Sequence, residues 1–398
     1  MLSRFCLLVF FVHTVAAQVS ISARTDKTEY LVGEPVIVLI EVKNIGDTPL
    51  VYGFGCDHDV QIKIPGLATE SNDRYGCGRG VGGDSCGGID HPPQLQPGSS
   101  RIFRRLLQNY RLGPGNFVVK VSGKSEVSRL SGKRDNIEGN TISASLPIFV
   151  RDGTDDELKK IYQPLVEAAT CSLENLSYEE LERASETRYM ARKAIAEMAP
   201  PFLFNLLRSF ALDKHNWSEG IRGLARMNTA ESRNMLVELY EQSTDLVFQH
   251  SVAYALMSIA HPAQLDFFAG LLHGDKAAKD RNIQSIAIEA LGRIGGWRAV
   301  AAFKAFHTDD AQLTNDLIYA LGTTASQDAV PLLIKEYSAF NEGAPACEAL
   351  TQLTHHDWCA VPPSRRSRVW SKWWGTHQEQ LHIYNKDDCE WGNPVPLK

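Results

Sequence analysis

The densest group of titratable side chains in the sequence is His355-His356-Asp357, followed closely by Cys359. A thiol beside an imidazole can act as a nucleophile with its general base, and the same side chains can hold a metal ion. The group also follows the last stretch of helical periodicity, where polar residues are typical of a surface turn. Both interpretations stay open, so a hydrolase or lyase with a Cys/His or metal site is an alternative function.

A second group of possible metal ligands surrounds the glycine-rich segment between Cys77 and Cys86. His58, Asp59 and His91 could coordinate a metal ion there. Eight residues separate the two cysteines, whereas two to four separate the paired ligands of structural zinc sites. A disulfide that closes the loop explains the same cysteines, so we expect no metal and no other cofactor.

The charge balance excludes one large class of function. The chain has 41 basic and 47 acidic residues and a net charge of −6. Nucleic-acid binding needs a concentrated basic surface, which this composition does not indicate. The sequence also lacks the H-E-x-x-H motif of zinc proteases and the G-x-x-x-x-G-K-[ST] phosphate loop. We therefore expect a non-enzymatic protein with no nucleic-acid partner.

The first 17 residues have the features of a signal peptide. One basic residue, Arg4, precedes the apolar run FCLLVFFV at 5–12, and small residues end at Ala17. The apolar run is too short to cross a bilayer, so we expect cleavage before Gln18 and no stable membrane insertion afterwards. The mature protein is therefore predicted to be periplasmic or secreted.

Cleavage leaves seven of the eight cysteines. In an exported protein disulfides are the default, and an odd number leaves at least one thiol unpaired unless chains join covalently. A bridge between Cys359 and Cys389 would tie down the C-terminal tail, and one between Cys77 and Cys86 would close the glycine-rich loop. The spacing does not determine the connectivity.

Residues 18–152 have the pattern of a β domain. Short stretches rich in β-branched residues alternate with turns that contain Gly, Pro, Asn and Asp. Several short strands with few helical segments predict an antiparallel β-sandwich. The expected strands are 19–24, 36–42, 50–54, 60–64, 100–107, 116–122 and 141–150.

Four segments of this domain resemble bacterial immunoglobulin-like domains. They read YLVGEPV at 30–36, VKNIGDTP at 42–49, LQPG at 95–98 and LGPGNF at 112–117. The similarity covers about a third of the chain and involves turn and strand residues. It therefore implies a fold and carries no chemistry.

Residues 155–358 change to helical periodicity, and one short motif recurs in them. A small residue is followed by Leu or Ile, two variable positions and usually an apolar residue, at spacings of 29, 32, 35, 30 and 29 residues. Helix pairs of this length bury their apolar faces only by stacking, which predicts a right-handed α-solenoid. The copies are AIAEM at 194–198, GLARM at 223–227, ALMSI at 255–259, ALGRI at 290–294, ALGTT at 320–324 and ALTQL at 349–353. The pattern resembles the short, PBS-lyase-like HEAT repeats of bacteria.

The tail at 359–398 departs from the repeat and contains Trp370, Trp373 and Trp374 at the spacing of one helix face. An aromatic cap over the open end of the solenoid is the structural interpretation. Because tryptophan also anchors interfaces, these three residues, with His355 and His356, are candidate binding residues.

Together these features predict an exported, non-enzymatic scaffold that binds a protein partner through the solenoid surface. Residues 151–398 hold 25 basic and 33 acidic residues, whereas 18–150 hold 15 and 14. The acidic helical half weakly favours a basic or neutral partner. Binding or inhibition by the β-sandwich alone is a further alternative.

Overall fold

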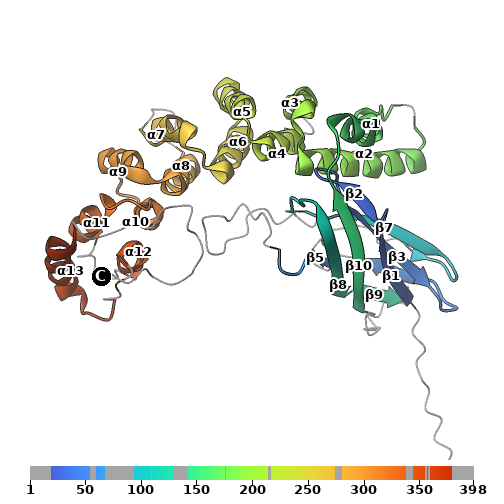
Figure 1. The fold of residues 1–398 in the computed structure, drawn as a ribbon, viewed down its shortest axis with the longest axis horizontal. Helices are drawn as coiled ribbons and strands as arrows, with labels where there is room; N and C mark the ends of the chain where they lie inside the picture. Colours follow the sequence, from blue (N-terminus) through green and yellow to red (C-terminus); the bar gives the residue numbers. More distant parts are fainter. Residues whose placement is uncertain are drawn as a thin grey trace, which may run out of the picture. The chain divides into compact units, whose positions relative to one another are not determined.

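The computed structural model describes residues 19–53, 60–67, 94–108, 110–124, 126–129, 141–174, 176–213, 217–273, 280–337, 344–354, 356 and 359–378. A β-rich region comes first, and helices packed in pairs follow it (Figure 1). The described residues divide into two compact units, 19–167 and 168–378. The predicted order of a β region before a helical region is confirmed. The predicted signal peptide at 1–17 lies outside the described residues.

Ten strands of the described residues form three sheets. The sheet orders are β1-β3-β7, β2-β10-β8-β5 and β6-β4-β9. The strands are β1 (Val19–Thr25), β2 (Glu29–Leu31), β3 (Ile37–Asn44), β4 (Leu50–Gly53), β5 (Val60–Lys63), β6 (Gln94–Leu95), β7 (Ser100–Leu106), β8 (Gly115–Lys124), β9 (Glu126–Arg129) and β10 (Thr141–Arg151). All seven predicted strands occur, with ends within two residues of those expected.

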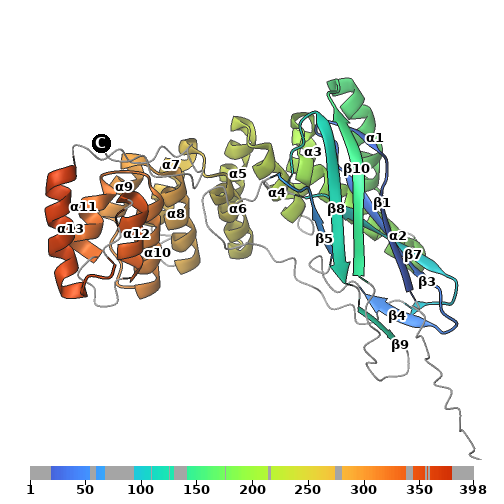
Figure 2. The ribbon, with the colours of Figure 1, turned by 60° about the horizontal axis from the view of Figure 1, so that its bottom comes forward.

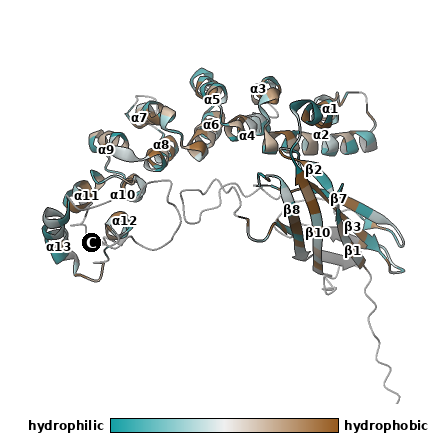
Figure 3. Ribbon diagram, in the orientation of Figure 1, coloured by the Kyte–Doolittle hydropathy of each residue, from teal (hydrophilic) through white to brown (hydrophobic). Residues whose placement is uncertain are grey.

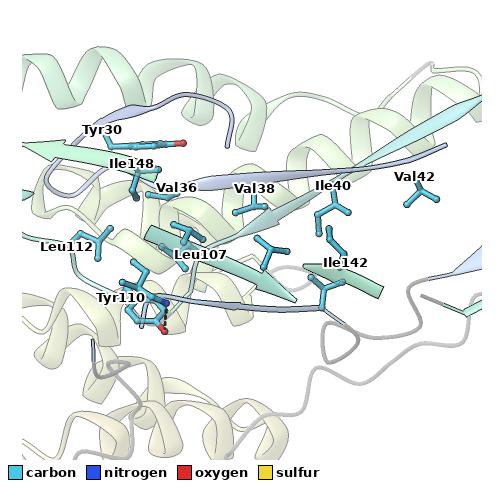
Figure 4. Close-up of a cluster of buried hydrophobic side chains, with 14 of the residues drawn as sticks. Tyr30, Val36, Val38, Ile40, Val42, Leu107, Tyr110, Leu112, Ile142 and Ile148 are labelled. Atoms are coloured by element: carbon cyan, nitrogen blue, oxygen red, sulfur yellow. Dashed lines mark hydrogen bonds between the residues drawn. The ribbon is translucent and has the colours of Figure 1, made fainter. Parts of the chain in front are cut away.

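The sheets β1-β3-β7 and β2-β10-β8-β5 contribute to one hydrophobic core (Figure 4). Alternate residues of β3 and β8 are buried, as expected for strands with one face on a core. Val38 and Ile40 of β3 are fully buried, and Val119 of β8 and Ile148 of β10 belong to the same cluster. The period-two pattern of the sequence therefore decides which side of each strand remains at the surface.

One edge pairing differs from the predicted antiparallel arrangement, because β2 runs parallel to β10. The helix α1 (Asp155–Thr170), expected in the helical domain, belongs to the first unit through Glu167. The hydroxyl of Tyr162 donates a hydrogen bond to the carbonyl of Gly33 at 2.8 Å. Arg151 also bridges Glu29 and Glu157. These contacts attach the start of α1 to the β region.

The second unit contains twelve further helices among the described residues. They are α2 (Tyr178–Met198), α3 (Phe204–Ala211), α4 (Trp217–Met227), α5 (Ala230–Gln242), α6 (Leu246–Ile259), α7 (Leu265–His273), α8 (Arg281–Ile294), α9 (Gly296–Ala305), α10 (Ala311–Thr323), α11 (Ala329–Leu332), α12 (Ala344–Thr354) and α13 (Pro363–His377). Short 3-10 turns precede α3 and α7, and a π turn follows α11. No helix of the described chain is long and apolar enough to span a membrane.

The even-numbered helices α2 to α12 pack consecutively against one another, and each repeated motif lies on one of them. Figure 2 shows α8, α10 and α12 side by side, and Figure 3 shows hydrophobic and hydrophilic stretches alternating along the helices. Glycines allow the close approach at two of these contacts. A Cβ on Gly292 or on Gly322 would lie 2.9 Å from the Cα of Ala320 or of Ala349, respectively.

Candidate interaction surface

The repeated motif buries one side of each even-numbered helix and turns the opposite side outward. Its second residue is fully buried in all six helices. An α-helix turns about 100° per residue, so the residue two positions earlier lies about 200° away, on the opposite side. We call the six residues at that position the even-helix face. They are Lys193, Arg222, Tyr254, Glu289, Tyr319 and Glu348.

Most of the even-helix face is accessible. Arg222, Glu289 and Glu348 are exposed, and Tyr319 exposes 51% of its surface, whereas Tyr254 is half-buried. Lys193 is the exception, because it is buried with its amine over the ring of Tyr189, 5.8 Å from the centroid. That ring is itself half exposed. A row of polar and aromatic side chains therefore lies along the six even-numbered helices.

The charges along the even-helix face are segregated. Arg222 on α4 is exposed and forms no ion pair with another described residue. Glu348 on α12 is likewise exposed and forms no ion pair within the described chain. Glu289 on α8 binds Arg293 one turn later. Within the described chain, the face thus presents a cation on α4 and an anion on α12 that form no ion pairs.

Side-chain bridges fix the spacing of the helices that carry this face. His250 of α6 lies with its Nε2 2.8 Å from Oδ2 of Asp280, the N-cap of α8. Burial by itself would raise the pKa of Asp280. The hydrogen bond with His250 and those from the backbone N–H groups of Ile283 and Asn282 outweigh burial, so the pKa is lowered. Asp280 therefore caps α8 and also binds α6 through His250.

Two further bridges repeat this arrangement at other helix pairs. Arg226 of α4 lies 3.1 Å from Glu197 of α2, with both side chains almost buried. The hydroxyl of Ser285 on α8 donates a hydrogen bond to Asp316 on α10 at 2.7 Å. The residues of the even-helix face are therefore carried on helices with defined neighbours.

The tryptophans of α13 are mostly buried, which corrects their prediction as binding residues. Trp370 is completely buried and Trp373 is 6% exposed, because the two rings pack edge to face against each other at 5.7 Å. Trp374 is half-buried. Buried rings present little surface to a partner, and the structural interpretation as an aromatic cap fits Trp370 and Trp373 better.

The histidines near the cap are only partly described. His356 lies edge to face with Trp373 at 4.7 Å, and His377 stacks on the same ring at 5.0 Å. His377 is not among the residues predicted from the sequence, although its position one turn after Trp373 could have indicated the contact. His355 and Asp357 lie outside the described residues.

The disulfide of this region differs from the expected one. Cys359 pairs with Cys347, at a Cα–Cα distance of 5.5 Å, and not with Cys389. The turn after α12 returns Cys359 to that helix, where Cys347 is buried. The disulfide contains the sulfur of Cys359, which a Cys/His site would need as a free thiol. Cys171 is the free thiol of the described residues.

The remaining predicted ligands lie outside the described residues: His58, Asp59, His91, Cys77, Cys86 and Cys389. Within the described parts of the chain, no three His, Cys, Asp or Glu side chains are grouped to hold a metal ion. Residues 83–87 read G-x-S-x-G, a motif that marks a nucleophilic serine only between a strand and a helix. They too lie outside the described residues.

Comparisons with known proteins add little. No protein-family model and no curated protein matches the chain. The structure of human deoxyhypusine hydroxylase in complex with glycerol is 15% identical over 57% of this chain and 98% of its own, with a TM-score of 0.26. A mutant of Salmonella alpha-2-macroglobulin is 12% identical over 89% of this chain but 27% of its own, with a TM-score of 0.19. Both similarities are weak and support no conclusion about function.

Proposed function

We propose that this protein is an exported, non-enzymatic scaffold that binds a partner protein through the even-helix face. The helical region is then a right-handed, HEAT-like α-solenoid, and the β region is an immunoglobulin-like sandwich. The proposal rests on one observation: the same motif position is buried on all six even-numbered helices, and the opposite position is exposed on α4, α8, α10 and α12. A repeated outward row suits an extended partner, since such a row forms a long continuous surface.

The chemistry of the row supports protein recognition. Tyrosine and arginine are enriched where protein surfaces meet, and Tyr319, Tyr189 and Arg222 are accessible here. Arg222 on α4 and Glu348 on α12 have opposite charges and form no ion pair with another described residue. They favour one orientation of the partner, in which its own charges lie in the opposite order. The disulfide between Cys347 and Cys359 is consistent with an oxidising compartment.

The test is affinity capture from the exported fraction of the native source, with variants on each side of the helical layer. We expect Arg222→Glu and Tyr319→Ala to lose the captured protein, because both change the even-helix face. Matched controls are Arg208→Glu on α3 and Trp297→Ala on α9, which are exposed on odd-numbered helices. Circular dichroism verifies that each variant folds. Equal capture by all four variants would contradict the proposal.

A further inference from the structure

The outward face of the sheet β2-β10-β8-β5 carries two lysines in direct opposition. Lys63 of β5 and Lys120 of β8 are register partners, and both are exposed. Directly opposed residues of an antiparallel pair have Cβ atoms about 5 Å apart, and like charges at that separation destabilise the sheet. Neither lysine forms an ion pair with another described residue. Among the described residues, therefore, no carboxylate compensates this cation pair.

An apolar patch adjoins the lysines on the same face. Val118 lies two residues before Lys120 on β8, and Pro147 of β10 is its register partner. Phe149 follows on β10, and it exposes 43% of its surface, as does Val118. Aliphatic and aromatic side chains exposed beside an unpaired charge are typical of a binding surface rather than of a solvated sheet face. Apolar and cationic groups thus form one continuous strip.

The carboxylates of this face do not neutralise the lysines. The described outward residues of β5 and β8 include none, and Ser145 faces Lys120 from β10. Glu29 lies on the far edge strand β2, opposite Phe149, and is bound to Arg151 at 2.7 Å. A ligand that supplies its own carboxylates would therefore meet the lysines without competition from the sheet.

We infer that this face binds a short extended peptide segment of a partner protein, with two carboxylates two residues apart at one end and an apolar side chain four residues after the second, so that all three point to the same side. Residues along a strand rise about 3.4 Å each, so the cation pair and Phe149 are separated by about 14 Å along β8 and β10. An extended peptide covers this distance with four to five residues. The carboxylates bind Lys63 and Lys120, and the apolar side chain packs on Val118 and Phe149.

The number of charges favours a peptide over other anionic partners. Membrane-binding patches typically gather four to eight basic residues, and nucleic-acid surfaces neutralise many phosphates. This strip has two lysines, and the apolar Val118, Pro147 and Phe149 adjoin them. A pair of carboxylates with a nearby apolar group matches both parts.

The test is fluorescence anisotropy of the full chain with a labelled, end-blocked peptide of sequence ESESGSF, at low and physiological salt. We expect the double variant Lys63→Gln/Lys120→Gln to weaken binding about tenfold, since two charge-assisted contacts are lost. Phe149→Ser should weaken it by a similar factor. Lys43→Gln, on the outward side of β3, is the matched control and should bind as the native protein does.

The double variant should unfold at the same or a higher urea concentration, because it removes a repulsive pair, so a loss of binding cannot be attributed to misfolding. Equal binding of the neutral peptide QSQSGSF, equal weakening by Lys43→Gln, or no binding of ESESGSF by the native chain would overturn the inference. So would phosphatidylserine vesicles that bind through these lysines when the peptide does not.

Discussion

Substituting Gly322 by alanine tests whether close packing of the even-numbered helices holds the helical unit together. An added Cβ would lie 2.9 Å from both the Cα and the Cβ of Ala349 on α12. Carbon atoms pack best at about 3.5–4.0 Å, so α10 and α12 must separate locally by about 0.6–1.1 Å. Overpacking of this kind costs about 1–3 kcal/mol, and the better helix propensity of alanine returns about 1 kcal/mol.

Gly270 on α7 is the matched control, because an added Cβ there meets nothing within 4 Å. Gly270→Ala should raise the free energy of unfolding by about 0.4–1 kcal/mol through a less flexible unfolded chain. The two variants should therefore differ by about 1–3 kcal/mol, measured by urea unfolding followed at 222 nm. Gly292→Ala repeats the test between α8 and α10. A Gly322→Ala protein as stable as Gly270→Ala would refute the reasoning.

Two further predictions concern bridges within the helical unit. Replacing Cys347 and Cys359 by serine opens a loop of 12 residues and should lower the free energy of unfolding by about 3 kcal/mol, measured by denaturant unfolding, while Cys171→Ser has little effect. Asp280→Asn keeps the N-cap but loses the charge that faces His250. Because the pKa of Asp280 is lowered in the folded state, its contribution is present above the unfolded value near 3.8 and disappears as the pH falls through the folded value. The native protein should therefore exceed Asp280→Asn in urea midpoint at pH 6 and lose this advantage at pH 2.

The strands predicted from the sequence are those that have turn signals and a periodic pattern within their own residues. The segment at 36–42 alternates buried and outward residues between turn signals, and β3 occupies it within two residues at each end. The three missed strands, β2, β6 and β9, have only two to four residues. Their pairing depends on distant partners, as β2 does when it lies along β10. A strand of two or three residues, such as β6 or β2, is too short to show a periodicity.

The contacts of α1 and of the turn after α12 also depend on residues that are distant in the sequence. The amphipathic pattern of α1 identifies a helix, but the choice of Gly33 as the partner of Tyr162 depends on a residue 129 positions away. The partner of Cys359 was likewise open, because the thiol pairs with whichever cysteine the turn after α12 brings close. The sequence limited the possible pairs without selecting one.

The repeat is the case in which local periodicity also predicts a surface. Once the motif residue is known to be buried, helical geometry places the residue two positions before it on the opposite side of the helix. The exposed residues Arg222, Tyr319 and Glu348 follow without any distant contact, whereas the burial of Lys193 does not. The chemistry at those positions differs from copy to copy, while the buried residue is Leu or Ile in all six. The proposed recognition of a partner at several points follows from this arrangement, because each helix contributes its own side chain. The outward row, rather than the dense titratable cluster after α12, is therefore the part of the sequence that best indicates function.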